Sequence, residues 1–435
     1  MSGARRRLGP VTAVALVVGN IIGAGIFMLP AALAPYGWNA VVAWTVTLAG
    51  SLCLAWVFAQ LVAQRPQGGG THGAIAEAFG EKVAFFTSWG YLVSVLAANA
   101  ALTVTGVNYL QRLVPAIGTL PFGPQAVALA LIALFAWGNA RAMAGGIQVV
   151  STVIKVLPFA LVIGLAAWLL GTQGGAAVAP VDVVPIEASA AFAAIGVTMY
   201  ALLGLESAAV PSDAIDEPAR NVPRATMIGT AIAGVLTLLS SSAVALMMPQ
   251  ATLAASTAPI ADFVGGFVGE GAGAFVAFCA VVSCFGALNG WLLVGAELPA
   301  AMSRAGSLPR WYARANARGV PVNALWLAAA VTGVFVLLAM SRGGVKAFEA
   351  LALVSTVTAL FLYVVACLAA GRFALGGRLA ARPSLMAALA GALAFSAVTL
   401  YGCGAEALAW SVGLLALGWP LRRWAALESR RGTPG

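Results

Sequence analysis

The sequence predicts an all-α integral membrane protein, and three observations carry that prediction. Hydrophobic residues make up 61% of the 435-residue chain, charged residues make up only 9%, and the mean hydropathy is +0.96. In a soluble domain roughly a quarter of the residues are charged. Apolar stretches of about 20 residues, the length that crosses a bilayer as a helix, recur along the whole chain. The segments between them are too short to form a folded soluble domain.

Twelve such stretches predict twelve transmembrane helices. Their bounds are approximate, because sequence patterns place helix ends only to within a few residues. In chain order the predicted spans are 11–34, 39–63, 84–111, 122–140, 146–170, 190–211, 225–248, 271–300, 322–341, 347–370, 384–402 and 407–424.

The distribution of lysine and arginine predicts the orientation of these spans, because cytoplasmic segments carry the excess of basic residues. With the N-terminus inside, 19 of the 23 basic residues are cytoplasmic. Arg112, Arg342 and Lys346 lie outside, and Lys155 lies within a span. We therefore expect a multi-pass protein of the cell (inner) membrane with both termini in the cytoplasm. The same skew accounts for the net charge of +9 without any nucleic-acid partner.

The first span contains an unusual stretch, Gly19-Asn20-Ile21-Ile22-Gly23-Ala24-Gly25-Ile26-Phe27. Its glycines predict a helix that is interrupted at mid-membrane. An interrupted helix leaves backbone groups unpaired, which is tolerated only where the break lines a cavity. The preceding Arg5–Arg7 resembles the start of a signal peptide, but the apolar run is too long, so we expect it to remain attached.

The sixth span repeats this pattern with Gly204 and Glu206 inside an apolar segment. The two predicted breaks are five spans apart, so the second unit enters the membrane from the opposite side. Paired interruptions of this kind indicate an inverted-repeat transporter with its binding site at mid-bilayer. The expected divisions are 1–171 for the first repeat, 172–371 for the second, and 372–435 for two further helices and a tail.

Polar residues inside other spans are candidates for function. Lys155 is costly at its depth unless it is paired or neutral, and it lies too far from Arg141 to reach the interface easily. Buried Glu206 is a candidate proton carrier. It is also suited to a structural role, in which it hydrogen-bonds the backbone of the interrupted helix. Asn99 and Tyr91 lie loosely on one side of span three, where Asn99 either bonds a neighbouring helix or faces a cavity.

Several other features indicate no separate chemistry. The five cysteines lack metal-ligand spacing, and we interpret them as small core residues. The triple glycine at 68–70 lacks the Lys-Ser/Thr of a phosphate loop. We expect no cofactor and no metal site. His72, the only histidine, is either a pH sensor or a solvated loop residue, and residues 73–80 predict a short interfacial helix.

Four stretches resemble the amino acid–polyamine–organocation (APC) transporters, in particular the basic amino acid/polyamine antiporters and, among these, the arginine/agmatine antiporters. The resemblance covers nearly the whole chain. It implies a five-plus-five inverted repeat with broken helices 1 and 6, two peripheral helices, and a homodimer in a lipid bilayer. The stretches are Gly19–Phe27 with Pro30, Gly204–Ser207, Pro218–Ala225 and Gly286–Trp291.

The resemblance also implies roles for individual residues. Backbone N–H groups near Ala24 and Gly25 would hold the substrate carboxylate, and the Ile21 carbonyl would accept from its amine. The implied substrate-binding residues are Ile21, Gly23, Ala24, Gly25, Asn99, Tyr200, Leu203, Gly204 and Trp291. Tyr91, Tyr200 and Trp291 are the implied gating residues, and Glu206 and Lys155 are the candidates for proton coupling.

Two positions depart from the arginine/agmatine pattern. Tyr200 replaces a tryptophan, which leaves the substrate open, and Lys155 replaces an apolar residue. Proton-coupled carriers of the same superfamily place a lysine in span five, where its ammonium can occupy a sodium site.

The sequence therefore predicts a secondary active transporter of amino acids, including basic amino acids and their decarboxylated amines, that works by alternating access. Exchange is the first hypothesis, and proton symport through Lys155 is the alternative. A channel or membrane sensor is a more distant alternative, because the spans lack a continuous polar face. An enzyme is disfavoured because nucleophiles and histidines are not clustered. The roles of His72 and Glu297 stay open.

Overall fold

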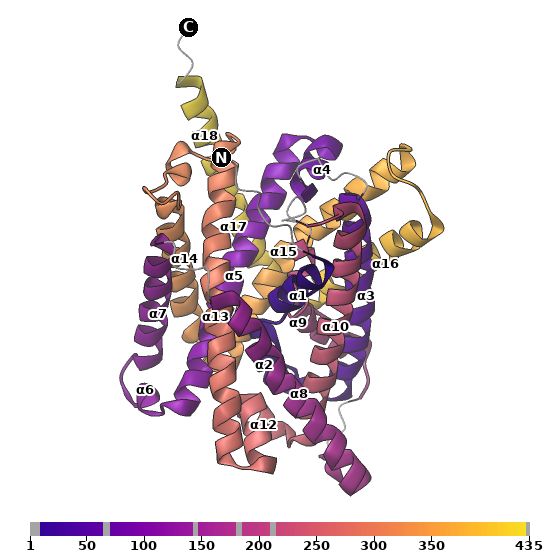
Figure 1. The fold of residues 1–435 in the computed structure, drawn as a ribbon, viewed down its shortest axis with the longest axis vertical. Helices are drawn as coiled ribbons and strands as arrows, with labels where there is room; N and C mark the ends of the chain where they lie inside the picture. The colour runs from indigo at the N-terminus through magenta and orange to yellow at the C-terminus, as the bar shows by residue number, and fades with distance from the viewer. Residues whose placement is uncertain (1–8, 64–69, 142–146, 180–184, 209–214, 432–435) are drawn as a thin grey trace.

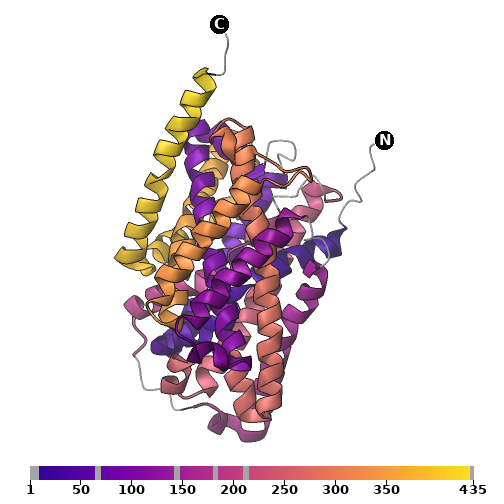
Figure 2. The ribbon, with the colours of Figure 1, turned by 90° about the vertical axis from the view of Figure 1, so that its left-hand side faces the viewer.

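The computed structural model describes residues 9–63, 70–141, 147–179, 185–208 and 215–431, and every regular element in these ranges is a helix. Long helices pack side by side into a bundle, and the C-terminal helix projects from one end (Figures 1 and 2). The all-α prediction is therefore confirmed for the described residues.

The helices carry the following bounds. They are α1 Pro10–Ile21, α2 Ala24–Leu33, η1 Ala34–Tyr36, α3 Trp38–Ala63, α4 Gly70–Phe79, α5 Glu81–Leu113, α6 Ala116–Thr119, α7 Gly123–Ala140, α8 Ile147–Gln173, η2 Gly174–Ala177, α9 Ala188–Tyr200, η3 Leu205–Ala208, α10 Pro218–Met247, α11 Gln250–Ala255, α12 Pro259–Val268, α13 Glu270–Arg304, η5 Arg310–Ala313, α14 Val322–Met340, α15 Gly344–Leu375, α16 Pro383–Gly402, α17 Gly404–Ala416 and α18 Gly418–Arg431.

Nine helices in the described ranges are long and apolar enough to cross a bilayer, and one bent pair raises the number to ten. Within the described residues the structure therefore supports nine or ten of the twelve predicted spans. Span six corresponds to the 13-residue α9, and span twelve corresponds to α17 and α18, which are separated at Leu417. The short helices α11 and α12 fall in a segment where no helix was predicted.

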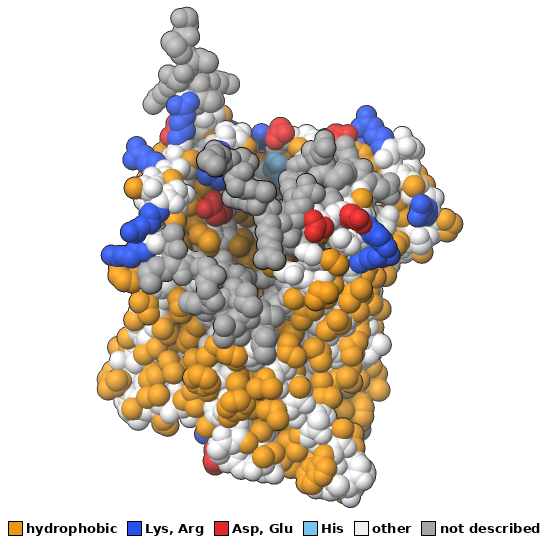
Figure 3. All heavy atoms as spheres, viewed as in Figure 1, with side chains coloured by type: hydrophobic (Ala, Val, Ile, Leu, Met, Phe, Trp, Pro, Cys, Tyr) orange, Lys and Arg blue, Asp and Glu red, His pale blue; other side chains and the backbone are white. Residues whose placement is uncertain are grey.

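The surface agrees with a membrane-embedded bundle. Hydrophobic side chains cover the middle and lower parts of the face in Figure 3, while most of the visible lysine and arginine side chains gather near its upper end. Such a separation matches an apolar band that contacts lipid and a basic end that contacts water.

Helix α5 forms the centre of the bundle and packs against α13, α14 and α15. Small side chains allow this packing, because a Cβ at Gly106 of α5 would lie 2.7 Å from the Phe285 ring of α13. On another face, the Ser94 and Ser355 hydroxyl oxygens lie 3.0 Å apart and join α5 to α15. These contacts fix the helices that line the site described below.

Both predicted interruptions coincide with non-helical backbone. Helix α1 ends at Ile21, α2 begins at Ala24, and the segment bends by 42°. Helix α9 ends at Tyr200, and Gly204 has a φ of +100°, a conformation that glycine adopts without steric cost. The short η3 that follows packs against α1, so the two interruptions lie side by side.

Candidate functional site

A small cavity lies between the two interruptions, with walls supplied by α1, α5, α9, η3, α13 and α15. Eight of the predicted site residues line it, so segments far apart in the sequence converge here. The eight are Ile21, Gly23, Tyr91, Tyr200, Leu203, Gly204, Glu206 and Trp291.

The cavity has a volume of about 50 Å³. One water needs about 10–15 Å³ of such a cavity, so this volume holds a few waters and is too small for an amino acid of the size of lysine. Substrate entry therefore requires the lining side chains to move apart. The aromatic side chains are the largest that line the cavity, and Tyr200 packs edge-to-face on Phe348 of α15 with ring centroids 5.5 Å apart.

Glu206 lies at the wall of this cavity and is 4% exposed. Tyr91 of α5 donates a 2.6 Å hydrogen bond to its Oε1, and Tyr363 of α15 donates to its Oε2. A buried carboxylate is tolerated when hydrogen-bond donors satisfy both oxygens. The two hydroxyls thus hold Glu206 in place and join α5, η3 and α15 around the cavity.

Tyr363 was not among the predicted site residues, although it lies in predicted span ten. Its only sequence signal is a phenol within an otherwise apolar segment, which suits a buried hydrogen bond. Asn20 and Ser355 also line the cavity without having been predicted as site residues. Their positions depend on helix rotation, which the amino-acid pattern of these nearly all-apolar spans does not define.

Lys155 is buried on α8 and lies outside this set of lining residues. Its Nζ donates a 2.9 Å hydrogen bond to the carbonyl oxygen of Gly19 in the last turn of α1. Carbonyls in a last helical turn lack intrahelical partners and carry partial negative charge. The interruption after Ile21 thereby creates a binding position for an ammonium group, and the Cys284 thiol of α13 is its nearby titratable neighbour.

Asn99 is fully buried but does not line the cavity. Neither atom of its amide has a hydrogen-bond partner among the described residues. A Cβ built on Gly295 of α13 would lie 3.8 Å from its Nδ2, so the amide faces α13. Ala24 and Gly25 open α2, but their side-chain surroundings lie outside the described residues.

His72 differs from the solvated-loop interpretation. It lies within α4, is partly buried, and its Nδ1 is 2.8 Å from the Ser88 hydroxyl of α5. The short helix predicted at 73–80 is confirmed as a helix, but it runs from Gly70 to Phe79 and so includes the histidine. Glu297 forms an exposed ion pair with Arg304, with a 3.5 Å separation.

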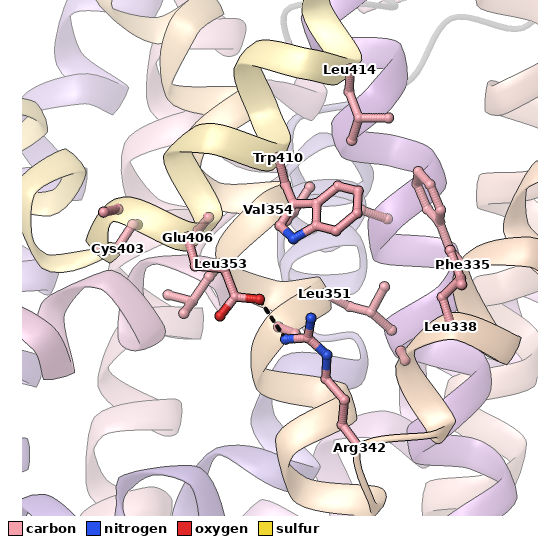
Figure 4. A pocket seen from close by; sticks show the side chains of 16 residues that line it. Phe335, Leu338, Arg342, Leu351, Leu353, Val354, Cys403, Glu406, Trp410 and Leu414 are labelled. Carbon is pink, nitrogen blue, oxygen red and sulfur yellow. Dashed lines mark ion pairs between the residues drawn. The ribbon is translucent and has the colours of Figure 1, made fainter.

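A second cavity, of about 330 Å³, lies between α14, α15 and α17. Figure 4 shows its apolar wall, including Trp410 and Leu351, and the 2.8 Å ion pair between Arg342 and Glu406 beside it. It contains none of the predicted site residues. Its one ionic pair is already satisfied, so this cavity offers little to recognise a charged amine.

Comparison with known families places the chain among transporters. The model of the family described as amino acid permease matches residues 8–405. The chain belongs to the amino acid permease family. This membership, together with the apolar helices, makes the protein a multi-pass membrane transporter and not an enzyme.

Curated relatives of this permease are transporters of amines. It is 29% identical over 434 residues to the putrescine transporter PotE of Haemophilus influenzae, covering 97% of each chain. It is 30% identical over 426 residues to PotE of Escherichia coli K12, covering 95% of each chain. The cadaverine/lysine antiporter of Escherichia coli K12 is 29% identical over 359 residues, which cover 80% of this chain and 79% of the antiporter.

Proposed function

We propose that this permease exchanges a basic amino acid for a decarboxylated amine through the cavity between its two helix interruptions. The observation that carries the proposal is the position of Glu206, a buried carboxylate among aromatic side chains. Relatives named as putrescine and cadaverine/lysine transporters support the same substrate class.

The cavity chemistry suits a flexible cation. Aromatic faces such as those of Tyr200 and Trp291 attract an ammonium group by about 0.5–2 kcal/mol. Glu206 provides an anionic acceptor at the wall. The first N–H groups of α2 lack intrahelical partners and favour a carboxylate, which an amino acid has and a diamine lacks. One site therefore accommodates both substrates. The amino acid contacts the N–H groups of α2 through its carboxylate, and the diamine leaves those groups without this contact.

Asn99 completes this proposal as a residue that binds substrate after the cavity widens. A buried amide without partners costs about 1–3 kcal/mol, so a ligand that satisfies it gains that amount. Gating follows from the same geometry, because release of Tyr91 and Tyr363 from Glu206 frees α5 and α15 to move. Tyr200 of α9 and Trp291 of α13, which line the same cavity, then move aside to admit substrate.

The proposed architecture is two inverted repeats, residues 1–171 and 172–371, that rock against each other. Residues 372–435 would add the peripheral helices, which offer a face for a homodimer. The skew of basic residues supports cytoplasmic termini in the inner membrane.

Counterflow in proteoliposomes tests the proposal. Vesicles loaded with putrescine should take up labelled lysine, arginine or putrescine, while empty vesicles should not. Leucine and alanine serve as matched apolar competitors and should leave uptake unchanged. Equal competition by leucine, or uptake into empty vesicles without a proton gradient, would contradict the exchange of cationic substrates.

Proton symport is a second candidate, and Lys155 is the observation that favours it. Its ammonium lies on the Gly19 carbonyl, where a bound cation would otherwise stabilise the end of α1. A protonation cycle at this amine would couple proton movement to the interruption. Substrate accumulation driven by an imposed proton gradient in vesicles without internal substrate would favour symport over exchange.

A further inference from the structure

Helix α18 projects from one end of the bundle (Figures 1 and 2). A separate pocket of about 480 Å³ lies beside the first turns of this helix. It is lined by the first turn of α5, the turn after α13, and α18. Its polar lining consists of Glu81, Ser307, Arg422 and Arg423, with Trp419 as the aromatic wall. None of the proposed transport residues contributes to it.

Trp419 organises the cations around this pocket. Its ring stacks on Phe86 of α5, with centroids 6.2 Å apart and an interplanar angle of 20°. Lys82 Nζ lies 4.9 Å from the ring centroid of Trp419, and the Arg423 guanidinium carbon lies 5.2 Å from it. Arg422 lies over Phe85, at 5.6 Å. Aromatic faces therefore hold all three cations in place.

The positive charge here is only partly balanced. The ion pairs between described residues involve other basic side chains, and none involves Lys82, Arg422 or Arg423. Glu81 is the one carboxylate of the pocket lining. Two lining arginines and the neighbouring Lys82, set against one carboxylate, leave a site that favours an anion.

Two hydrogen bonds fix the position of α18 beside the pocket. Trp89 of α5 donates a 3.0 Å hydrogen bond to the Leu414 carbonyl in the last turn of α17, the helix that precedes α18. Further along, the Arg310 N–H donates to Glu428 at 2.9 Å and ties α18 to η5. These contacts keep Arg422 and Arg423 beside α5.

The same helix carries large exposed apolar side chains next to its arginines. Trp424 and Leu427 of α18, and Leu417 directly before it, are each at least half exposed. Exposed tryptophan and leucine beside arginine is the pattern of a segment at the bilayer surface. The pocket is therefore next to lipid headgroups, and a lipid is a better occupant than a free anion.

We propose that this pocket binds the headgroup of an anionic phospholipid of the phosphatidylglycerol class. Arg422, Arg423 and Lys82 would contact the phosphate, since clustered basic residues beside a membrane helix favour anionic lipids. The Glu81 carboxylate would accept a hydrogen bond from a headgroup hydroxyl, and Ser307 would contact the same hydroxyl groups. A glycerol headgroup provides both the phosphate and these hydroxyls.

Lipid binding by the full-length purified permease tests this proposal, with phosphatidylglycerol titrated in detergent and bound lipid counted by native mass spectrometry. The variant R422Q/R423Q should bind phosphatidylglycerol about tenfold or more weakly, because each basic residue near a membrane contributes about 1 kcal/mol. The matched control R314Q/R318Q removes two exposed arginines from the same end of the bundle and should change binding less than twofold.

Two further variants and a control lipid complete the experiment. R422K/R423K keeps the charge and should retain the lipid within about threefold, and K82Q provides a milder variant if the double glutamine variant fails to fold. Phosphatidylcholine should show no difference among variants. Equal loss in R314Q/R318Q, or displacement of the lipid by millimolar inorganic phosphate, would overturn a specific lipid site.

Discussion

The Lys155 ammonium lies 2.9 Å from the carbonyl oxygen of Gly19, joining α8 to the last turn of α1 where that helix is interrupted. The contact satisfies a carbonyl that the interruption leaves without an intrahelical donor. Replacement of Lys155 by alanine removes this donor and leaves the α1 end unsupported. We expect exchange in proteoliposomes to fall at least tenfold and its pH dependence to flatten.

The matched control is Lys346→Ala, which removes an exposed lysine from the first turn of α15 and should leave transport unchanged. Lys155→Arg, which keeps the charge, should retain more activity than the alanine variant. Uptake that survives Lys155→Ala with its pH dependence intact would exclude a role in coupling.

Tyr363 provides a second prediction through its hydrogen bond to Glu206. Tyr363→Phe leaves one carboxylate oxygen without its donor, which costs about 1–3 kcal/mol in a buried site. Because this bond joins α15 to η3, we expect the exchange rate to change at least fivefold in counterflow assays. Tyr401→Phe, at a tyrosine that is 71% exposed, is the control and should behave as the unmodified protein.

A double-mutant cycle separates this interaction from a general packing effect. In a Glu206→Gln background the acceptor pattern is already altered, so Tyr363→Phe should then change the rate less than twofold. Independent, additive effects of the two substitutions would show that the hydroxyl acts elsewhere.

The fold class and much of the candidate site were predictable because glycine and charge inside apolar spans are strong signals. Gly23, Gly204 and Glu206 violate the composition of a lipid-facing helix, and all three line the cavity. Tyr363 was missed, since an isolated tyrosine gives no information about which residue it meets 157 positions away. Such long-range pairing depends on helix packing and rotation.

The errors have equally local causes. Three glycines lie just before Thr71 and His72 and predict a loop, but packing of α4 on α5 overrides that preference and supplies Ser88 as a partner. The helices α11 and α12 are too short to produce a transmembrane signal. The division of α17 from α18 at Leu417 has no glycine or proline at that residue, although Gly418 follows directly.

The interruption in the first span gives a prediction that distinguishes the two substrate classes. Gly25 is the second residue of α2, where backbone N–H groups have no intrahelical partner and, in the proposed function, bind the substrate carboxylate. Gly25→Leu should block their approach and reduce lysine binding at least tenfold, whereas a diamine without a carboxylate should lose less. Ligand-induced thermal shifts measure both, and equal losses would contradict carboxylate recognition by α2. Gly164→Leu, in open space on α8, is the control.

Packing between α3 and α16 supplies a test of the fold itself. A Cβ on Gly50 would lie 2.1 Å from Cγ of the Phe395 ring, which is buried. Gly50→Ala should therefore destabilise the protein by about 1–3 kcal/mol through overpacking and lower its melting temperature. Gly50→Ala combined with Phe395→Leu should recover part of the loss. Gly164→Ala, with no neighbour within 4 Å of its Cβ, should show no loss, and equal melting temperatures for both single variants would contradict the close approach.

Asn99 provides the test that separates substrate contact from helix packing. Its buried amide has no partner among the described residues, so Asn99→Leu should raise the melting temperature of the substrate-free protein by removing an unsatisfied polar group. If the amide binds substrate in the widened cavity, the same variant should lose at least half of the stabilisation that lysine or putrescine confers. A helix-packing role predicts the reverse, with a lower melting temperature and unchanged ligand stabilisation. Thr105→Val, at another buried unpartnered group of α5, is the matched control and should gain stability without losing substrate response.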